Sequence, residues 1–194
     1  TRVDVAAATA QSLAERIAAI RSESAELRAI YEDHAGVRDR FTAAGTLAPK
    51  LARRLGVLGL AGRASGQALD ARIDFPCAPY DELPPTKAVR QEGDVAARVA
   101  VRFEELAESC RLAASLLAPL PAGAHLAPVA APAEGAFATG LIEGWRGPVF
   151  VALEAGPGGT IHRCHPHDPS WQNWPAIEHA ILGNIVADFP LINK

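Results

Sequence analysis

Five potential metal ligands lie close together near the C-terminal end of the sequence: His162, Cys164, His165, His167 and Asp168. Imidazole, thiolate and carboxylate groups all bind transition metals, so this cluster has the right chemistry for a metal ion. The spacing argues against it, because in a strand His165 and His167 share a face with Arg163, whose positive charge repels a divalent cation. We therefore interpret these side chains as partly exposed residues at a strand end and assign no metal ligand in this chain. A metal-binding module remains a distant alternative.

A second group of polar side chains lies in a glycine-rich part of the chain. The segment Gly62–Gly66 contains Arg63 and Ser65, and Asp70 and Arg72 follow shortly after it. A guanidinium can donate to several carboxylate or carbonyl oxygens at once. The spacing therefore predicts a buried structural network of polar groups, made of Arg63, Ser65, Asp70 and Arg72.

The third group is the segment Glu143–Gly147, in which an acid and a base lie next to glycines at an expected strand turn. An arginine held there by the neighbouring backbone would project into a cavity, and Arg146 is the candidate. The alternative is a surface turn with a salt bridge between Glu143 and Arg146, which would contribute little to stability.

Two motifs that would indicate other chemistry are incomplete. Ser65 lacks the GxSxG nucleophile elbow and an identifiable histidine partner. The stretch Gly56–Gly62 has the spacing GxxGxxG rather than the GxGxxG of dinucleotide-binding loops, and no clear strand precedes it. The sequence therefore gives little support for nucleophilic catalysis or for a glycine loop that binds phosphate.

Two long amphipathic helices should position these groups. Apolar residues at three- and four-residue spacing predict a helix over 95–117, with Gly93-Asp94 as its cap. A second helix is predicted over 9–33 and should pack antiparallel against the first through apolar side chains at heptad spacing. That expected seam comprises Leu13, Ile17, Ile20, Leu27 and Tyr31.

The segments between these helices read as shorter or irregular. A short helix is predicted over 47–55. The many glycines of 56–66 favour close backbone approach or unusual dihedral angles rather than a regular element. The prolines of 70–85 predict a mostly extended loop.

The C-terminal part of the chain changes character. A final helix is predicted over 175–182, with Pro175 in its first turn and Asn173 as a nearby cap. The run 189–194 reads as strand-like. Alternating apolar residues and glycine-rich turns predict three short strands, over 137–142, 149–153 and 160–163.

Together these elements predict the α+β class: mainly a helical bundle, with a small antiparallel sheet near the C-terminal end. We expect one domain over 1–194. Its parts would be a helical bundle (1–118), an Ala/Pro-rich loop (119–136), and the sheet with a short helix (137–194).

Composition narrows the function. The chain has 194 residues, 49% of them hydrophobic, with 19 Lys and Arg against 22 Asp and Glu and a net charge of −3. This balance excludes a strongly basic nucleic-acid surface, and no apolar run is long enough to cross a membrane. The three cysteines form no CxxC pair and are expected to be free thiols. The chain has no Met and begins at Thr1, so we expect a fragment of a longer polypeptide.

Several motifs occur in a fixed order along the chain: Val37–Leu47, Leu55–Tyr80, Gly93–Glu104, Glu143–Gly147 and Asp168–Asn173. In this order they resemble the quinone-site large subunit of respiratory complex I and the related large subunits of membrane-bound NiFe hydrogenases. The sequence departs from that pattern at Leu60 and Trp145, where the family usually has proline.

The resemblance implies part of an oxidoreductase large subunit that helps to line an electron-acceptor cavity. Arg146 would be a cavity-lining cation that stabilises charge at the substrate position, and Glu143 would orient it or relay protons. The parent complex would be NADH dehydrogenase-like or hydrogenase-like, with a quinone or a Ni-Fe centre beside an iron–sulfur cluster. The fragment itself would bind no cofactor and would be inactive alone.

The resemblance also implies partners: an iron–sulfur small subunit and membrane subunits, in a peripheral arm on the cytoplasmic side of the membrane. No nucleic-acid partner is expected. The isolated fragment is expected to form a homodimer through apolar side chains of its first helix. The alternative function is a non-catalytic helical scaffold that keeps the fold without a redox site.

Overall fold

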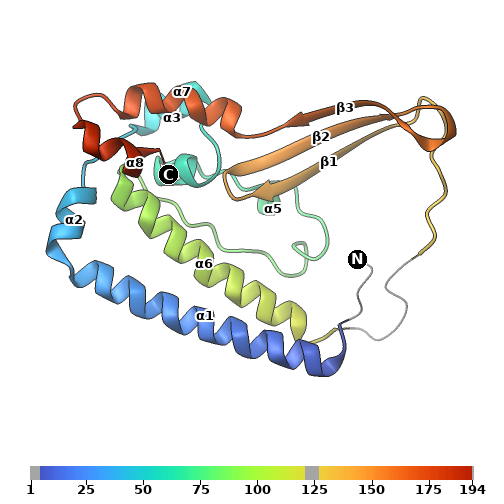
Figure 1. Ribbon diagram of the computed structural model, residues 1–194, viewed down its shortest axis with the longest axis horizontal. Helices are drawn as coiled ribbons and strands as arrows, with labels where there is room; N and C mark the ends of the chain where they lie inside the picture. The colour runs from blue at the N-terminus through green and yellow to red at the C-terminus, as the bar shows by residue number, and fades with distance from the viewer. Residues whose placement is uncertain (1–4, 121–126, 194) are drawn as a thin grey trace.

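The two longest helices lie side by side and run in opposite directions (Figure 1). The computed structural model describes residues 5–120 and 127–193. Helix α6 (Val95–Leu117) has the predicted bounds, and α1 (Ala7–Asp33) begins two residues earlier than predicted. Asp94 begins α6 by accepting a hydrogen bond from the backbone N–H of Ala97 (2.7 Å), which satisfies one of the free donors of the first turn.

The face that α1 turns toward α6 overlaps only in part with the predicted one. Leu13, Ile20 and Leu27 are exposed, with Leu27 at 60%. The seam does contain Tyr31, whose ring lies 6.2 Å from that of Phe103 on α6. The less exposed side of α1 comprises Ala10, Ala14, Ile17, Ser24, Arg28 and Tyr31. This set shares Ile17 and Tyr31 with the predicted seam and also has heptad spacing, so periodicity alone could not choose the residues beside them.

Four short helices follow α1 in the chain. They are α2 (Ala35–Phe41), α3 (Pro49–Leu55), α4 (Gly59–Ala64) and α5 (Ala71–Asp74). Of these, α4 packs on α6, α3 on α7 (Ser170–Ala180) and α5 on β1 (Phe137–Gly144). The existence of α4 corrects the prediction that 56–66 contains no regular element, whereas the predicted close backbone approach and unusual dihedral angles are confirmed. Its glycines serve close packing: a Cβ at Gly62 would lie 2.6 Å from the carbonyl oxygen of Val57. Leu60 and Ala64 of α4 pack against Val101 of α6 in one of the core clusters.

The sheet is a three-stranded antiparallel meander in the order β1-β2-β3, which confirms the predicted class. The strands are longer than predicted: β1 (Phe137–Gly144), β2 (Gly147–Ala155) and β3 (Ile161–His167), with the 3-10 turn η1 (Pro157–Gly159) between the last two. Strand β3 passes through Pro166, which an edge strand tolerates because one side of its backbone has no partner strand among the described residues. Of the predicted loop 119–136, residues 121–126 lie outside the described part.

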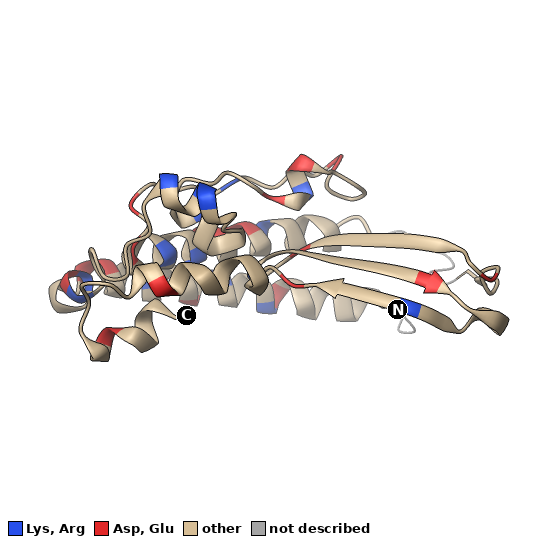
Figure 2. Ribbon diagram, turned by 90° about the horizontal axis from the view of Figure 1, so that it is seen from above, with Lys and Arg blue, Asp and Glu red and all other residues tan. Residues whose placement is uncertain are grey.

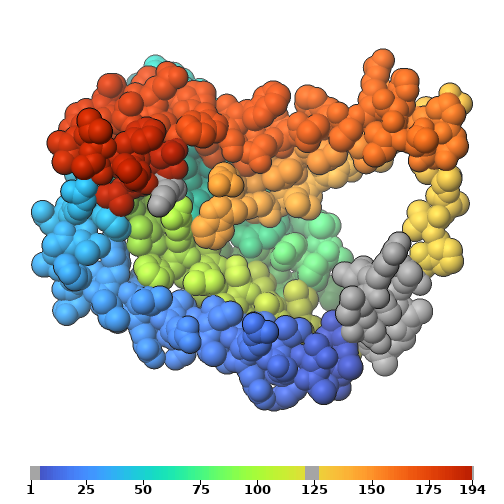
Figure 3. All heavy atoms as spheres, viewed as in Figure 1, coloured from blue at the N-terminus to red at the C-terminus, as the bar shows by residue number. Residues whose placement is uncertain are grey.

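The sheet extends away from the helices and contacts them at one end. Its turn end, at Gly144–Gly147, lies against the helices, and its other end lies away from α1 and α6 (Figures 1 and 3). Side chains from Phe137 to Ile142 are exposed. Lys, Arg, Asp and Glu are sparse on the strands compared with the helices (Figure 2).

The C-terminal segment differs from the prediction in two ways. Helix α7 (Ser170–Ala180) begins five residues earlier, so Pro175 lies inside it rather than in its first turn. Residues 189–193 of the run predicted as a strand do not form one: η2 (Val186–Asp188) leads into the helical turn α8 (Phe189–Ile192), and residue 194 lies outside the described part. The apolar character of that run has another cause, because Ile192 packs with Ala180 in the core. Within the described part of the chain, no helix combines the length and hydropathy that crossing a bilayer requires.

Candidate functional site

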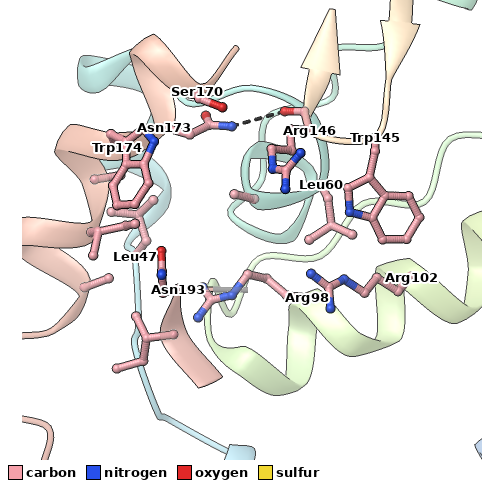
Figure 4. A pocket seen from close by; sticks show the side chains of 15 residues that line it. Leu47, Leu60, Arg98, Arg102, Trp145, Arg146, Ser170, Asn173, Trp174 and Asn193 are labelled. Carbon is pink, nitrogen blue, oxygen red and sulfur yellow. Dashed lines mark hydrogen bonds between the residues drawn. The ribbon is translucent and has the colours of Figure 1, made fainter. Parts of the chain in front are cut away.

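A cavity of about 490 Å³ lies where α4, α6, α7 and the β1–β2 turn meet (Figure 4). Its apolar lining includes Leu60, Trp145 and Trp174. Its polar lining is mostly cationic or amide, and no carboxylate belongs to it among the described residues. The polar side chains are Arg98, Arg102, Arg146, Ser170, Asn173 and Asn193.

The turn that carries Arg146 is held by backbone packed against α4. Gly59 adopts a left-handed conformation (φ +59°), and a Cβ there would lie 2.2 Å from the carbonyl carbon and oxygen of Arg146. Only glycine permits both the dihedral angle and this close approach. The contact fixes the turn at the rim of the cavity, where Arg146 itself is exposed.

Asn173 of α7 ties the same turn to α4. Its Oδ1 accepts a hydrogen bond from the backbone N–H of Leu58 (2.9 Å), and its Nδ2 donates to the carbonyl oxygen of Arg146 (3.1 Å). The predicted role of Asn173 as a helix cap was therefore wrong. It lies within α7 and positions the Arg146 turn (Figure 4).

Arg98 lies in the wall of the cavity and is only 6% exposed. Its Nη1 donates to the carbonyl oxygens of Gly45 (3.2 Å) and Gly93 (3.0 Å). Burial lowers the pKa of this guanidinium to about 10; the charge of Asp94 opposes the shift and that of Arg102 adds to it. A buried cation with this pKa still carries its charge at neutral pH.

Arg102 follows Arg98 by one helical turn and is half-buried. Its guanidinium carbon lies 5.5 Å from the ring centre of Trp145, a cation–π contact. Burial, followed by repulsion from Arg146, lowers the pKa of Arg102. The cavity is thus lined by three positive charges, two from α6 and one from the β1–β2 turn.

Behind the cavity, Arg63 forms the centre of a buried ionic network. It is 2% exposed. Its Nε donates to Glu105 Oε1 on α6 (2.5 Å), and its Nη1 donates to Glu143 Oε1 on β1 (2.9 Å). The second oxygen of Glu143 accepts from the backbone N–H of Ala71 (3.0 Å). The network joins α4, α5, α6 and the sheet.

This geometry separates residues that the sequence placed together. Glu143 pairs with Arg63, and no direct contact of Glu143 with Arg146 occurs in the described structure, so the predicted surface salt bridge is wrong. Asp70 and Arg72 form their own bidentate pair (3.0 and 2.7 Å). Ser65 is buried, but its hydroxyl finds no hydrogen-bond partner among the described residues.

The Asp70–Arg72 pair predicts acid-dependent stability. Burial raises the pKa of the Asp70 carboxyl, but hydrogen bonds and charge from Arg72 outweigh it, so the net pKa is lowered. The pair therefore stabilises the fold above the ordinary aspartate pKa of about 3.9, and this contribution is lost as pH falls through the lower folded-state value. Asp70→Asn should lower the free energy of unfolding at pH 7 by about 1–3 kcal/mol and flatten its decline in acid. Urea unfolding between pH 2.5 and 7 measures this; exposed Asp39→Asn is the control, and equal pH profiles for the two variants would contradict the prediction.

The histidine cluster lies away from the cavity, on edge strand β3. His162 and His165 are exposed, whereas His167 is half-buried against Trp171 (ring centres 5.4 Å apart) and hydrogen-bonds the Gln172 amide (2.9 Å). In residues 5–120 and 127–193, no three His, Cys, Asp or Glu side chains are arranged to hold a metal ion.

Sequence reasoning did not select Arg98, Arg102, Glu105 or Asn173 as site residues. For the two arginines a signal existed: they occupy positions four apart on α6, beside buried Val95 and Val101. A charged side chain beside the apolar stripe of a helix indicates that it has a buried polar partner or lines an internal cavity. No such signal marked Asn173, because its partners are 115 and 27 residues away.

The family described as "Respiratory-chain NADH dehydrogenase, 49 Kd subunit" matches residues 1–136. The chain belongs to this family. The match confirms the resemblance drawn from the ordered motifs. The region matched by the family contains helices α1 to α6, and the three strands and α7 come after it in the chain.

Individual relatives include both branches of that resemblance. The chain is 29% identical to the carbon monoxide-induced hydrogenase of Rhodospirillum rubrum, over 86% of this chain and 46% of the relative. It is 30% identical to formate hydrogenlyase subunit 5 of Escherichia coli K12 (89% and 30%), and 31% identical to an NADH-quinone oxidoreductase subunit of Bacteroides fragilis ATCC 25285 (84% and 31%). The chain thus spans less than half the length of these relatives.

The fold is shared with a solved structure, that of a membrane-bound sulfane sulfur reductase described as an archaeal respiratory membrane complex. The TM-score is 0.85 over 94% of this chain and 52% of the other, at 24% identity. At this identity the likeness establishes the fold of the 49-kDa-family chain and no more.

Proposed function

We propose that this 49-kDa-family chain forms one wall of the electron-acceptor cavity in the large subunit of a membrane-bound oxidoreductase. The observation that carries the proposal is the position of Arg146, which a glycine contact and an asparagine bridge fix at the rim of a cavity of about 490 Å³. Relatives of both the NADH-quinone oxidoreductase and hydrogenase kinds support the class of reaction.

The cavity residues suit an acceptor that gains negative charge. Guanidinium N–H groups of Arg146 and Arg102 donate to an oxygen on the acceptor and stabilise charge as electrons arrive. Trp145 and Trp174 border the same space and offer apolar ring faces to the acceptor. In this proposal Glu143 acts indirectly: by pairing with Arg63 it fixes the end of β1 and so orients Arg146.

The lining favours a quinone over a metal centre held by this chain. Guanidinium donors match carbonyl oxygens, and indole and Leu60 side chains match a planar apolar ring. Nickel–iron centres need thiolate ligands, and no cysteine lines the cavity in the described structure. These residues do not fit as ligands of such a centre, so we assign them no part in holding one.

Arg146→Gln in the assembled parent complex tests the proposal. Loss of a preorganised charge should lower the turnover number for electron transfer to a soluble quinone by about 100- to 1,000-fold, with Arg146→Lys retaining part of the rate. Arg163→Gln on β3 removes an equally charged, exposed side chain (78%) and should leave turnover unchanged. Unchanged turnover in Arg146→Gln, in a complex of normal composition, would favour the non-catalytic scaffold.

The proposal includes location and partners. Relatives named as subunits of NADH-quinone oxidoreductase and formate hydrogenlyase support assembly with further subunits. We propose an iron–sulfur small subunit beside the cavity and membrane subunits below it, on the cytoplasmic side. Co-purification of the parent with both, from solubilised membranes, tests this assignment.

Self-association of the isolated chain stays a prediction. The exposed side chains of Leu13, Ile20 and Leu27 recur every seven residues on α1, the spacing of a helix-pairing stripe. We expect sedimentation velocity to show a dimer for the unaltered chain and a monomer for Leu27→Gln. Ala29→Gln, an exposed position on α1 outside that stripe, is the control; a monomeric unaltered chain would refute the prediction.

A further inference from the structure

The arginines of the cavity have donors that nothing in the described structure satisfies. Nε and Nη2 of Arg98 are buried without a hydrogen-bond partner, and so is Nε of Arg102. An unpaired buried donor on a charged group costs more than one on a neutral group, so such groups normally meet an acceptor. Figure 4 shows the side chains of Arg98, Arg102 and Arg146 bordering the same space.

The acidic side chains nearby are committed elsewhere. Asp94, one turn before Arg98, accepts from the backbone N–H groups of Ala97 (2.7 Å) and Ala43 (2.8 Å), one on each oxygen. Its charge reaches Arg98 but no ion pair joins them in the described structure. Asp168 is exposed and accepts from the backbone N–H of Ser170 (2.8 Å).

The carboxylates of α6 are paired as well. Glu105 is bound by Arg63 (2.5 Å). Glu104 is bound by Arg90 and lies 3.9 Å from Arg28 of α1. Three cations therefore face one cavity whose described lining includes no carboxylate to balance them.

We propose that this cavity binds a dissolved oxyanion of the carboxylate, sulfate or phosphate class, through the accessible guanidinium groups of Arg102 and Arg146 and the charge of the buried Arg98 behind them. The proposal goes beyond the proposed function, because it requires no electron transfer and concerns this chain's own donors.

The geometry favours an oxyanion over a simple halide. Guanidinium N–H groups form a planar fork that matches two oxygens of one anion, which a spherical ion does not offer. The amide of Asn193 and the hydroxyl of Ser170 belong to the same lining and extend the set of donors. The buried side chain of Leu60 in the wall lowers the local dielectric constant on that side and strengthens each contact.

Calorimetric titration of the chain with inorganic phosphate tests this, at fixed ionic strength maintained with chloride. We expect saturable binding at one site. Arg102→Gln and Arg146→Gln should each weaken it at least tenfold, while Arg163→Gln should leave it unchanged. Sulfate should compete with phosphate, and further chloride should not.

Thermal unfolding separates a lost site from a lost fold. Because phosphate binds the folded chain, it should raise the Tm of the unaltered chain and of Arg163→Gln, and raise it much less in Arg102→Gln. Circular dichroism verifies that each variant is folded. No saturable binding of phosphate, sulfate or acetate, or equal affinity in folded Arg102→Gln, would overturn the proposal. Either result leaves the quinone-turnover test of Arg146 unaffected.

Discussion

Arg63→Met should lower the free energy of unfolding by about 3–5 kcal/mol, the largest effect we expect from a single substitution in this chain. The substitution keeps the apolar volume but leaves the carboxylates of Glu105 and Glu143 facing each other without a cation. Glu143 is 4% exposed and Glu105 is 16% exposed, so water cannot replace the lost partner. Urea unfolding measures the change, and Arg163→Met, at an exposed position, should cost less than about 0.5 kcal/mol.

A triple variant distinguishes the lost cation from lost packing. Adding Glu105→Gln and Glu143→Gln to Arg63→Met removes both stranded charges. Neutral groups in place of a buried ionic cluster often recover stability, so most of the loss should be regained. If the triple variant is no more stable than Arg63→Met, the network owes its effect to shape rather than charge.

Gly59→Ala should cost at least about 2 kcal/mol, from two separate causes. A left-handed backbone disfavours alanine by roughly 1 kcal/mol or more. The added Cβ would also lie 2.2 Å from the Arg146 backbone, so the β1–β2 turn must move. Gly158→Ala isolates the first cause, because Gly158 has φ +65° with no atom within 4 Å of an added Cβ.

The test compares the free energies of unfolding of the two glycine variants. Chemical unfolding of both should show Gly59→Ala as the more destabilised by about 1 kcal/mol or more. Tryptophan fluorescence of Trp145, next to the displaced residue, should change in folded Gly59→Ala and not in folded Gly158→Ala. Equal destabilisation would mean that the turn adapts to the methyl group without cost.

Local sequence rules predicted the elements well where local chemistry decides them. The bounds of α6 follow from its apolar spacing and the Asp94 cap, which act within one or two turns. The same rules placed Ile17 and Tyr31 correctly on the seam of α1 but chose Leu13, Ile20 and Leu27 wrongly, because two overlapping heptad patterns exist on α1 and only the partner helix selects one. They predicted the close backbone approach of the glycines in 56–66 but missed the short helix α4 that carries two of them, Gly59 and Gly62.

The candidate site was predicted less completely, because the residues that pair in it lie far apart in the sequence. Arg63, Asp70, Arg72 and Glu143 were recognised as polar groups, but their pairing was not, since Arg63 and Glu143 are 80 residues apart. Spacing assigns partners only within one element. The ordered motifs identified the family, whereas the contacts between those motifs became visible only in the fold.

The clamped base of the sheet has a mechanical consequence. The sheet is held to the helices at one end, by contacts of Glu143, Gly147 and the carbonyl group of Arg146. From that end the strands extend away from the helices (Figure 1). A force on the far end of the strands would displace that end widely, whereas the β1–β2 turn would hardly move. Bending of the sheet would therefore leave the backbone of Arg146 in place.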